Sequence, residues 1–290
     1  MSAPAAPTCP RDLRALVPPT ATQWWLLRPR AIFAHPRLGA ALSRSVDHLA
    51  ERALIDRAAR TGYDLRAVEQ GLWAATPAGE LALGLGAFDG AHILALLWER
   101  LLPPRRQSQG ARGVARVEGR LARAEVTAAI DSRCGIAAWA EGDTRLVDPA
   151  LLPPSEAEAT AGSAREVVRG RIDLDDARAT EALGPLRAQV RSVEVSAELT
   201  DRGVALAVSL RGALAPEVEG MIRARVARMT QSALLRAAGA STWCADARVG
   251  VARESDVARV TVEVPWEALD ALAEVVRGEV RDARDPALGF

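Results

Sequence analysis

The segment with the most specific chemical spacing is the glycine-rich sequence GLGAFDG at residues 84–90, between a predicted strand and a predicted helix. In that context glycines let backbone N–H groups approach a pyrophosphate, as in dinucleotide-binding proteins. Here Asp89 takes the place of the third glycine and would put a negative charge where the phosphates bind. The elements that follow are predicted to be antiparallel strands. We therefore interpret the segment as a capped helix start with small residues for close packing.

The three histidines, His35, His48 and His92, are the residues most suited to metal binding or acid–base chemistry. His48 and Glu51 are three residues apart on a predicted helix, so both could reach one metal ion. The sequence offers no evident third ligand for such a site. His35 precedes a proline in a loop, and His92 lies in the first turn of a helix. We predict solvated or capping roles for all three, with no metal and no cofactor.

Candidate nucleophiles occur in the sequence DSRCG at residues 131–135, where Ser132 and Cys134 follow Asp131. Neither residue lies in the Gly-x-Ser-x-Gly elbow of a hydrolase or in a known cysteine-protease context. The acidic sequence DLDD at residues 173–176 lacks the glycine and the distant glutamate of a calcium loop. A helix N-terminus, which favours negative charge, explains it more simply. The sequence therefore predicts no catalytic residue.

Cys9, Cys134 and Cys244 are the chain's three cysteines, and no two lie at metal-ligand spacing. Cys134 and Cys244 both fall in or beside predicted strands. One interpretation is two buried thiols. The other is a single disulfide between Cys134 and Cys244 that joins the two halves of the chain, which would require an oxidising compartment.

Adjacent tryptophans, Trp24 and Trp25, lie in a short predicted strand at residues 22–27. Neighbouring residues on a strand point to opposite faces of a sheet. A sheet covered on both faces would bury both rings. If one ring is exposed instead, it becomes a candidate anchor for a ligand or partner.

Strand-like alternation runs directly into an amphipathic helix over residues 80–102, 203–238 and 257–280. This pattern predicts an α+β fold of antiparallel sheets with helices packed on them, in two related ββα-type halves. We expect a flexible Pro/Ala-rich tail at 1–19, an N-terminal half at 20–148 and a linker at 149–170. A C-terminal ββαββα half then covers 171–284, followed by a tail at 285–290. The internal duplication is inferred from element order, because residue identity between the halves is poor.

The composition is that of a globular protein, with 49% hydrophobic and 26% charged residues. Basic and acidic residues are equal at 37 each, so no global field attracts nucleic acid. The most apolar region, residues 81–102, is interrupted by charged residues and predicts no membrane-spanning helix. As written, the chain indicates a cytoplasmic protein, whereas an export signal upstream of Met1 would place it in the periplasm or cell envelope.

Three short motifs carry a resemblance. The sequence LVPPTAT at residues 16–22 leads into a strand, GYDL follows the first long helix at 62–65, and GAFD at 86–89 leaves a strand for the next helix. Together they resemble uncharacterised bacterial exported proteins that carry a "vP-x-x-t" strand, a "G-x-D" and a "G-x-F-D" element. The resemblance covers roughly the first hundred residues. It implies an envelope location and supplies no catalytic residues.

The leading functional hypothesis is a non-catalytic envelope protein that works by binding or scaffolding, with an unknown ligand or protein partner. One rival is an enzyme or small-molecule-binding protein whose polar groups converge only in the fold. A pocket that gathers His48, His92 or Asp131 would favour that rival. A second rival is a cytoplasmic regulatory partner protein. The oligomeric state is not predicted.

Overall fold

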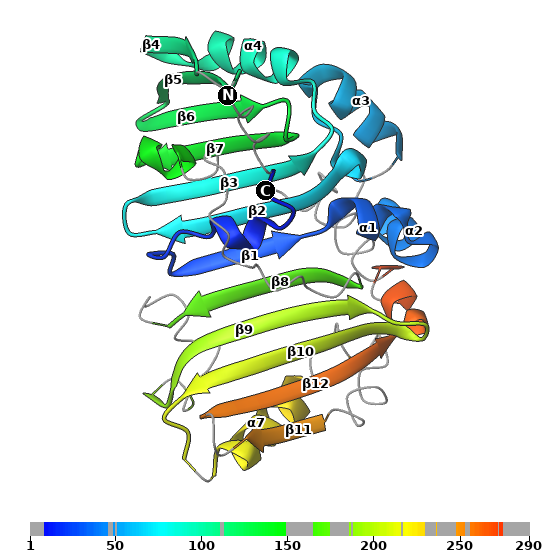
Figure 1. The fold of residues 1–290 in the computed structure, drawn as a ribbon. Coiled ribbons are helices and arrows are strands. Elements are labelled where there is room, and N and C mark those ends of the chain that lie inside the picture. The colour runs from blue at the N-terminus through cyan, green and yellow to red at the C-terminus, as the bar shows by residue number, and fades with distance from the viewer. Residues whose placement is uncertain are drawn as a thin grey trace, which may run out of the picture. The chain divides into compact units, whose positions relative to one another are not determined.

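The computed structural model describes residues 9–45, 49, 51–110, 113–148, 165–174, 186, 188–215, 217–229, 236, 248–252, 256–271 and 273–274. The chain forms two compact units (Figure 1). Unit 1 comprises Met1–Arg30 and Ile55–Gly162, and unit 2 comprises Ala31–Leu54 and Ser163–Phe290. Each unit is an antiparallel sheet with helices packed on it, so the predicted α+β class is confirmed.

Unit 1 contains a fully antiparallel sheet in the order β1-β2-β3-β7-β6-β5-β4. Its strands are β1 (Gln23–Leu27), β2 (Val68–Thr76), β3 (Gly79–Gly86), β4 (Leu102–Gln109), β5 (Ala115–Leu121), β6 (Ala124–Asp131) and β7 (Ile136–Gly142). The strand predicted at 22–27 is present as β1, and the strand predicted at the start of 80–102 is present as β3. Strand β4 was not predicted, because its Pro103-Pro104 pair indicates a stop rather than an edge strand.

Both faces of the unit 1 sheet carry apolar cores. On one face, α4 (Gly90–Arg100) packs over β5 and β6, in a cluster that contains Leu94, Val117 and Ile130. On the other face, the helical turns η1 (Leu13–Leu16) and η4 (Thr144–Val147) cover a cluster around Leu26, Leu72 and Leu83. The first core forms one wall of the site described below.

The N-terminal segment is anchored on the sheet of unit 1, so the prediction of a flexible tail over 1–19 is wrong for residues 9–19. Leu13 is fully buried, and its backbone N–H donates to Oε1 of Gln70 over 2.9 Å. Asp12 caps η1 by accepting from the backbone N–H of Arg14. The prolines of this segment indicate a linker, but Leu13 and Leu16 supply enough apolar surface to fix it. Residues 1–8 lie outside the described residues.

Cys9 forms a disulfide with Cys134, and the sulfur atoms are 2.03 Å apart. The predicted pairing of Cys134 with Cys244 is therefore wrong, since a sulfur atom joins one disulfide, and Cys244 lies outside the described residues. Cys9 is 125 residues from its partner in the sequence. The anchored N-terminal segment brings it to the turn between β6 and β7.

Unit 2 contains a five-stranded antiparallel sheet in the order β11-β12-β10-β9-β8. The strands are β8 (Glu166–Asp173), β9 (Val190–Leu199), β10 (Gly203–Gly212), β11 (Arg248–Ala252) and β12 (Val257–Pro265). Helix α7 (Val218–Met229) packs over one end of the apolar face through Val218 and Ile222. The two ββ pairs of the predicted ββαββα order are present as the hairpins β9–β10 and β11–β12, and residues 266–271 after β12 are helical.

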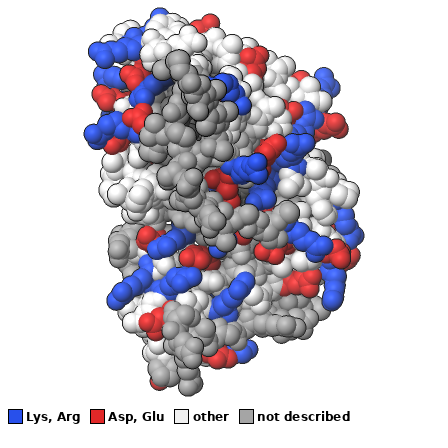
Figure 2. All heavy atoms as spheres, in the orientation of Figure 1, with Lys and Arg blue, Asp and Glu red and all other residues white. Residues whose placement is uncertain are grey.

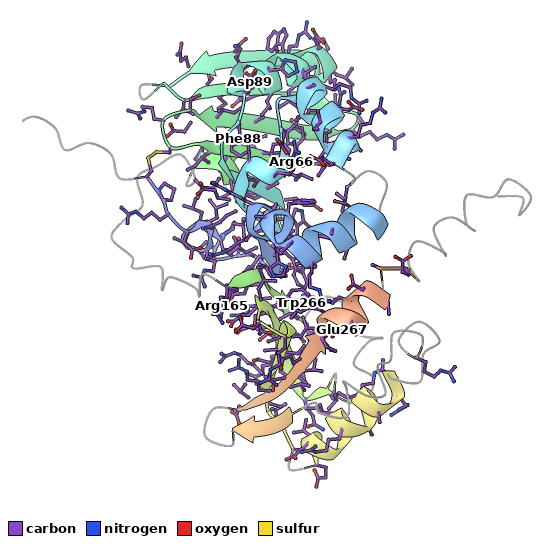
Figure 3. The ribbon with its side chains drawn as sticks, turned by 90° about the vertical axis from the view of Figure 1, so that its right-hand side faces the viewer. Arg66, Phe88, Asp89, Arg165, Trp266 and Glu267 are labelled. Atoms are coloured by element: carbon purple, nitrogen blue, oxygen red, sulfur yellow. A yellow bond between two sulfur atoms is a disulfide. The ribbon has the colours of Figure 1, made fainter. Side chains whose placement is uncertain are left out.

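A segment from the first half of the chain packs into unit 2. Helices α1 (Pro29–Ala34) and α2 (Pro36–Ser45) place Ala31, Ile32 and Leu38 against the core that contains buried Trp266. The His35 ring stacks on Trp266 with centroids 4.4 Å apart, and Arg37 pairs with Glu267. Trp266 and Glu267 lie together at the start of the helical segment after β12 (Figure 3). The predicted boundary of the N-terminal half at 20–148 is therefore wrong for residues 31–54.

The remaining boundaries differ in smaller ways. The predicted linker at 149–170 is too long, because β8 begins at Glu166, and residues 149–164 lie outside the described residues. Where the sequence predicts one long helix before residue 62, the structure has two helices, α2 and α3 (Glu51–Thr61). Gly62 ends α3 as predicted, with a φ of 69° that favours glycine. Most of the predicted C-terminal helix and the 285–290 tail fall outside the described residues.

The two units share a chain path. In unit 1, β1, β2 and β3 are neighbours, α4 follows, and the chain returns from the far edge through β4 to β7, which pairs with β3. In unit 2, β8, β9 and β10 are neighbours, α7 follows, and the chain returns through β11 to β12, which pairs with β10. Unit 2 follows the same route with two fewer strands.

Candidate functional site

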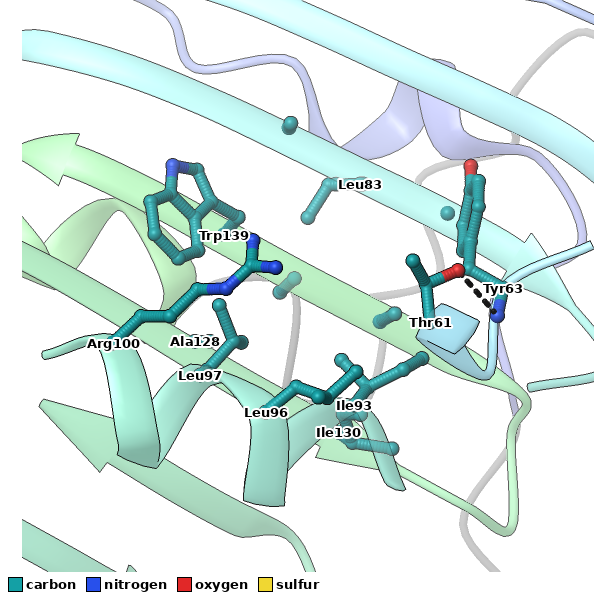
Figure 4. A pocket seen from close by; sticks show the side chains of 14 residues that line it. Thr61, Tyr63, Leu83, Ile93, Leu96, Leu97, Arg100, Ala128, Ile130 and Trp139 are labelled. Carbon is teal, nitrogen blue, oxygen red and sulfur yellow. Dashed lines mark hydrogen bonds between the residues drawn. The ribbon is translucent and has the colours of Figure 1, made fainter. Parts of the chain in front are cut away.

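A pocket of about 370 Å³ lies in unit 1 between α4 and the sheet (Figure 4). Its lining comes from the end of α3, the following loop, α4 and strands β3, β6 and β7. The lining residues are Thr61, Tyr63, Ala82, Leu83, Gly84, Ile93, Leu96, Leu97, Arg100, Ala128, Ile130, Ala137, Ala138 and Trp139. Most are apolar, and the pocket belongs to one unit of the chain.

Small side chains on the sheet create this space. Ala82 is opposite Trp139, and Trp139 is opposite Ala128, so these residues share a face. Gly84 and Ala137 form the next row on the same face. Helix α4 is held above them by larger residues nearby, and its Ile93, Leu96 and Leu97 form the opposite wall. A helix supported by large residues over a floor of alanine and glycine leaves a cavity.

The loop after α3 forms one end of the pocket. Thr61 Oγ1 donates to the carbonyl of Arg57 and accepts from the backbone N–H of Tyr63. The Tyr63 ring stacks on Phe88 with centroids 5.5 Å apart, and burial raises the pKa of the Tyr63 hydroxyl. Phe88 lies over Gly84, where an added Cβ would come within 2.9 Å of the ring. This end is therefore aromatic, with two neutral hydroxyl groups, of which that of Thr61 is already hydrogen-bonded to the backbone.

Arg100, in the last turn of α4, contributes the one charged side chain among the lining residues. The close-up shows its side chain extending from the helix toward Trp139 (Figure 4). It is exposed, and it has no hydrogen bond or ion pair with any residue that the structure describes. The pocket is thus an apolar cavity with a single cationic group at its mouth.

The polar residues considered for catalysis do not line this pocket. His92 follows the cap of α4, where its backbone N–H donates to Asp89, and its Nε2 lies 3.0 Å from the carbonyl of Arg60. Asp131 accepts backbone N–H groups of the β6–β7 turn, from Arg133 and Cys134. His35 lies in unit 2, where Nδ1 accepts the backbone N–H of Leu38. His48 falls outside the described residues.

The glycine-rich segment has the role predicted for it. Asp89 caps α4, and it lies beside Phe88 at the end of β3 (Figure 3). A Cβ at Gly90 would come within 2.8 Å of Ile130, so this glycine permits close packing of the helix on the sheet.

The other acidic candidates do not gather a metal site in the described ranges. Asp173 accepts from Nε of Arg171 at 2.9 Å, and Asp175 and Asp176 lie outside those ranges. Glu51 begins α3, but its proposed partner His48 is not described. Among all described residues, no three His, Cys, Asp or Glu side chains are grouped as a metal would require.

Trp24 and Trp25 occupy opposite faces of β1, and both are half-buried. Trp24 packs against the core beneath η1, which removes it as a free anchor. Trp25 pairs in register with Trp73, on the face that also carries Trp139 and the pocket floor. The sequence analysis identified Trp25 but not the pocket. The pocket depends on alanines of different strands, and only the strand register shows that they lie on one face of the sheet.

On the face drawn in Figure 2, basic and acidic side chains are interspersed, and neither charge forms a large patch of its own. This agrees with the equal numbers of basic and acidic residues. No helix within the described ranges is both long and apolar enough to cross a membrane.

Comparison with known proteins gives fold similarity alone. No protein-family profile and no curated protein matches the sequence. Two solved structures of a protein named TP0453 are similar. Crystal form III has a TM-score of 0.52 at 14% identity, covering 90% of this chain and 97% of that one. Crystal form I has a TM-score of 0.50 at 12% identity, covering 94% of this chain and 98% of that one. At these identities the likeness concerns the fold.

Proposed function

We propose that this protein is a non-catalytic binding protein that holds a small, mainly apolar molecule in the pocket beneath α4. The observation that carries the proposal is the pocket itself. Its volume of about 370 Å³ falls in the range of ligand sites, and its lining of aliphatic and aromatic side chains with a few polar groups is typical of them.

The volume sets the size of the ligand. Taking roughly 30 Å³ for each non-hydrogen atom, as for water in the liquid, the pocket accommodates about a dozen such atoms. Burying the apolar part of such a molecule would provide most of the affinity. Ile93, Leu96 and Leu97 of α4 would cover it on one side, and the sheet would cover it on the other.

We place this activity in the bacterial envelope. The disulfide between Cys9 and Cys134 supports that location, because disulfides persist in oxidising compartments and are rare in the cytosol. The resemblance to exported proteins points the same way. The cytoplasmic regulatory alternative predicts free thiols at both positions instead.

The same chain path in both units supports an internal duplication, with the first unit enlarged by two strands. The duplicated helix-on-sheet layer would then have acquired a ligand pocket in unit 1 through replacement of large residues by alanine and glycine. Trp25, next to Trp73 on the same face, remains the candidate for a contact with a partner.

The enzyme alternative required His48, His92 or Asp131 to converge in a pocket. His92 and Asp131 have structural partners near α4 and the β6–β7 turn, and neither lines the pocket. This arrangement favours binding over catalysis.

The test is calorimetric titration with 1-decanol, a neutral apolar probe of suitable size. We expect saturable binding by the unaltered protein and a loss of at least tenfold in affinity for Ala82→Leu, whose side chain would fill the floor of the pocket. Ala95→Leu is the matched control, because Ala95 is exposed on α4 and does not line the pocket. No binding, or equal binding by both variants, would exclude the proposal.

A further inference from the structure

We infer that the ligand is a single-chain anionic amphiphile, with its apolar body in the pocket beneath α4 and its carboxylate on the Arg100 guanidinium. This inference rests on the proposed function and adds the chemical class of the ligand.

The charge pattern of the lining carries the inference. Arg100 is the one charged residue that lines the pocket. No acidic lining residue is therefore present to repel an anionic ligand or to neutralise the Arg100 guanidinium. A guanidinium group presents several N–H donors in a plane that matches a carboxylate. Arg100 uses none of them toward any residue in the described ranges. Its donors are therefore available to a ligand.

The position of Arg100 fits an amphiphile rather than a compact anion. The guanidinium is exposed at the mouth, where a carboxylate keeps part of its hydration, while the apolar lining lies behind it. Trp139 lines the pocket near the same end of α4 (Figure 4). A wholly hydrophilic anion would leave that lining unused.

The opposite end is suited to an uncharged group. Tyr63 is half-buried, and its hydroxyl has no hydrogen-bond partner among the described residues. Burial raises the pKa of this hydroxyl, so it stays neutral at physiological pH. The Tyr63–Phe88 stack provides apolar surface for the end of the ligand chain. The ligand is thereby oriented, with its charge at Arg100 and its tail toward Tyr63.

The size of the pocket favours a free single-chain carboxylate over a phospholipid as the anionic ligand. Space for roughly a dozen non-hydrogen atoms matches one chain of the length of decanoate. The inference is therefore a free carboxylate with one chain, not a lipid headgroup in a membrane.

The experiment compares decanoate with 1-decanol by calorimetry at low ionic strength. We expect decanoate to bind about tenfold more tightly, since charge-assisted hydrogen bonds are roughly twice as strong as neutral ones. Arg100→Gln should abolish that preference, because the affinity for decanoate should fall by about tenfold more than the affinity for 1-decanol. Arg123→Gln is the matched control, because it removes the same charge from an exposed turn that does not line the pocket.

Three outcomes would overturn the inference. Decanoate could bind no more tightly than 1-decanol, its preference could survive Arg100→Gln, or the protein could sediment with phosphatidylglycerol vesicles in an Arg100-dependent way. The last result would assign the site to a lipid headgroup. Failure of the proposed function is distinguishable, because there 1-decanol itself would not bind or would ignore Ala82→Leu.

Discussion

Helices α4 and α7 occupy the same place in the chain path of their units, but they cover different surfaces. Beneath α7, the sheet of unit 2 presents Val193, Val208, Leu210 and Val260. Beneath α4, the sheet of unit 1 presents alanines and a glycine over much of the contact, and a pocket remains. The difference shows that a shared backbone layout does not determine whether a pocket forms. The volumes of a few side chains between the layers do.

The largest expected contrast is in the loss of stability when one apolar side chain of each helix is replaced by alanine. Ile222 of α7 is 3% exposed within its core, so Ile222→Ala should destabilise unit 2 by about 2–5 kcal/mol. Leu97 of α4 is half-buried and already faces the pocket, so Leu97→Ala should cost unit 1 only about 1 kcal/mol. Hydrogen exchange of peptides from β10 and β6 would report each unit separately. Equal costs would mean that the pocket does not weaken the α4 layer.

Unit 1 also has a covalent link that unit 2 lacks among its described residues. Cys9→Ser should lower the stability of unit 1 by about 2–4 kcal/mol, because the link no longer restricts the unfolded chain. Exchange in β6 and β7 should increase, while β9 and β10 should be unaffected. Cys244→Ser is the control.

The pairing itself can be checked by alkylation of the unfolded, unreduced protein followed by intact mass measurement. One added label is expected, on Cys244. Three labels would contradict the disulfide and remove its support for an envelope location.

The sequence predicted those parts of the fold that depend on local pattern. Asp89 as a helix cap, Gly62 as a helix end and both hairpins of unit 2 follow from residues near one another in the chain. The disulfide to Cys9 and the packing of residues 31–54 in unit 2 could not be predicted, because both depend on contacts between distant segments. The pocket was missed for the same reason, since its floor is assembled from three strands.

A smaller contrast concerns the ion pairs that hold terminal and connecting segments on each unit. Burial alone would raise the pKa of Asp12 in unit 1, but hydrogen bonds from the Arg14 side chain and backbone, with nearby positive charge, lower it below its usual value. A carboxylate whose pKa is lowered by folding stabilises the protein at pH values above its pKa in the unfolded chain, which is about 3.9. This stabilisation is lost as the pH falls through the pKa of the folded state.

Unit 1 should therefore lose stability below about pH 4 more steeply than an Asp12→Asn variant does. The measurement is the urea midpoint of unit 1 between pH 7 and pH 3, followed through exchange in β2. Parallel pH profiles for the two proteins would show that this carboxylate is not linked to folding.

The smallest effect is expected at the corresponding pair of unit 2, where Arg37 meets Glu267 at 3.2 Å. Its side chains are 47% and 75% exposed, against 14% and 10% for Arg14 and Asp12. Water and salt screen an exposed pair, so Arg37→Gln should leave the urea midpoint of unit 2 unchanged. Trp266→Ala is the positive control, because burial of this ring in the core attaches α1 and α2 to unit 2. A midpoint shift for Arg37→Gln as large as that for Trp266→Ala would mean that charge, rather than the apolar contact, holds residues 31–54 in place.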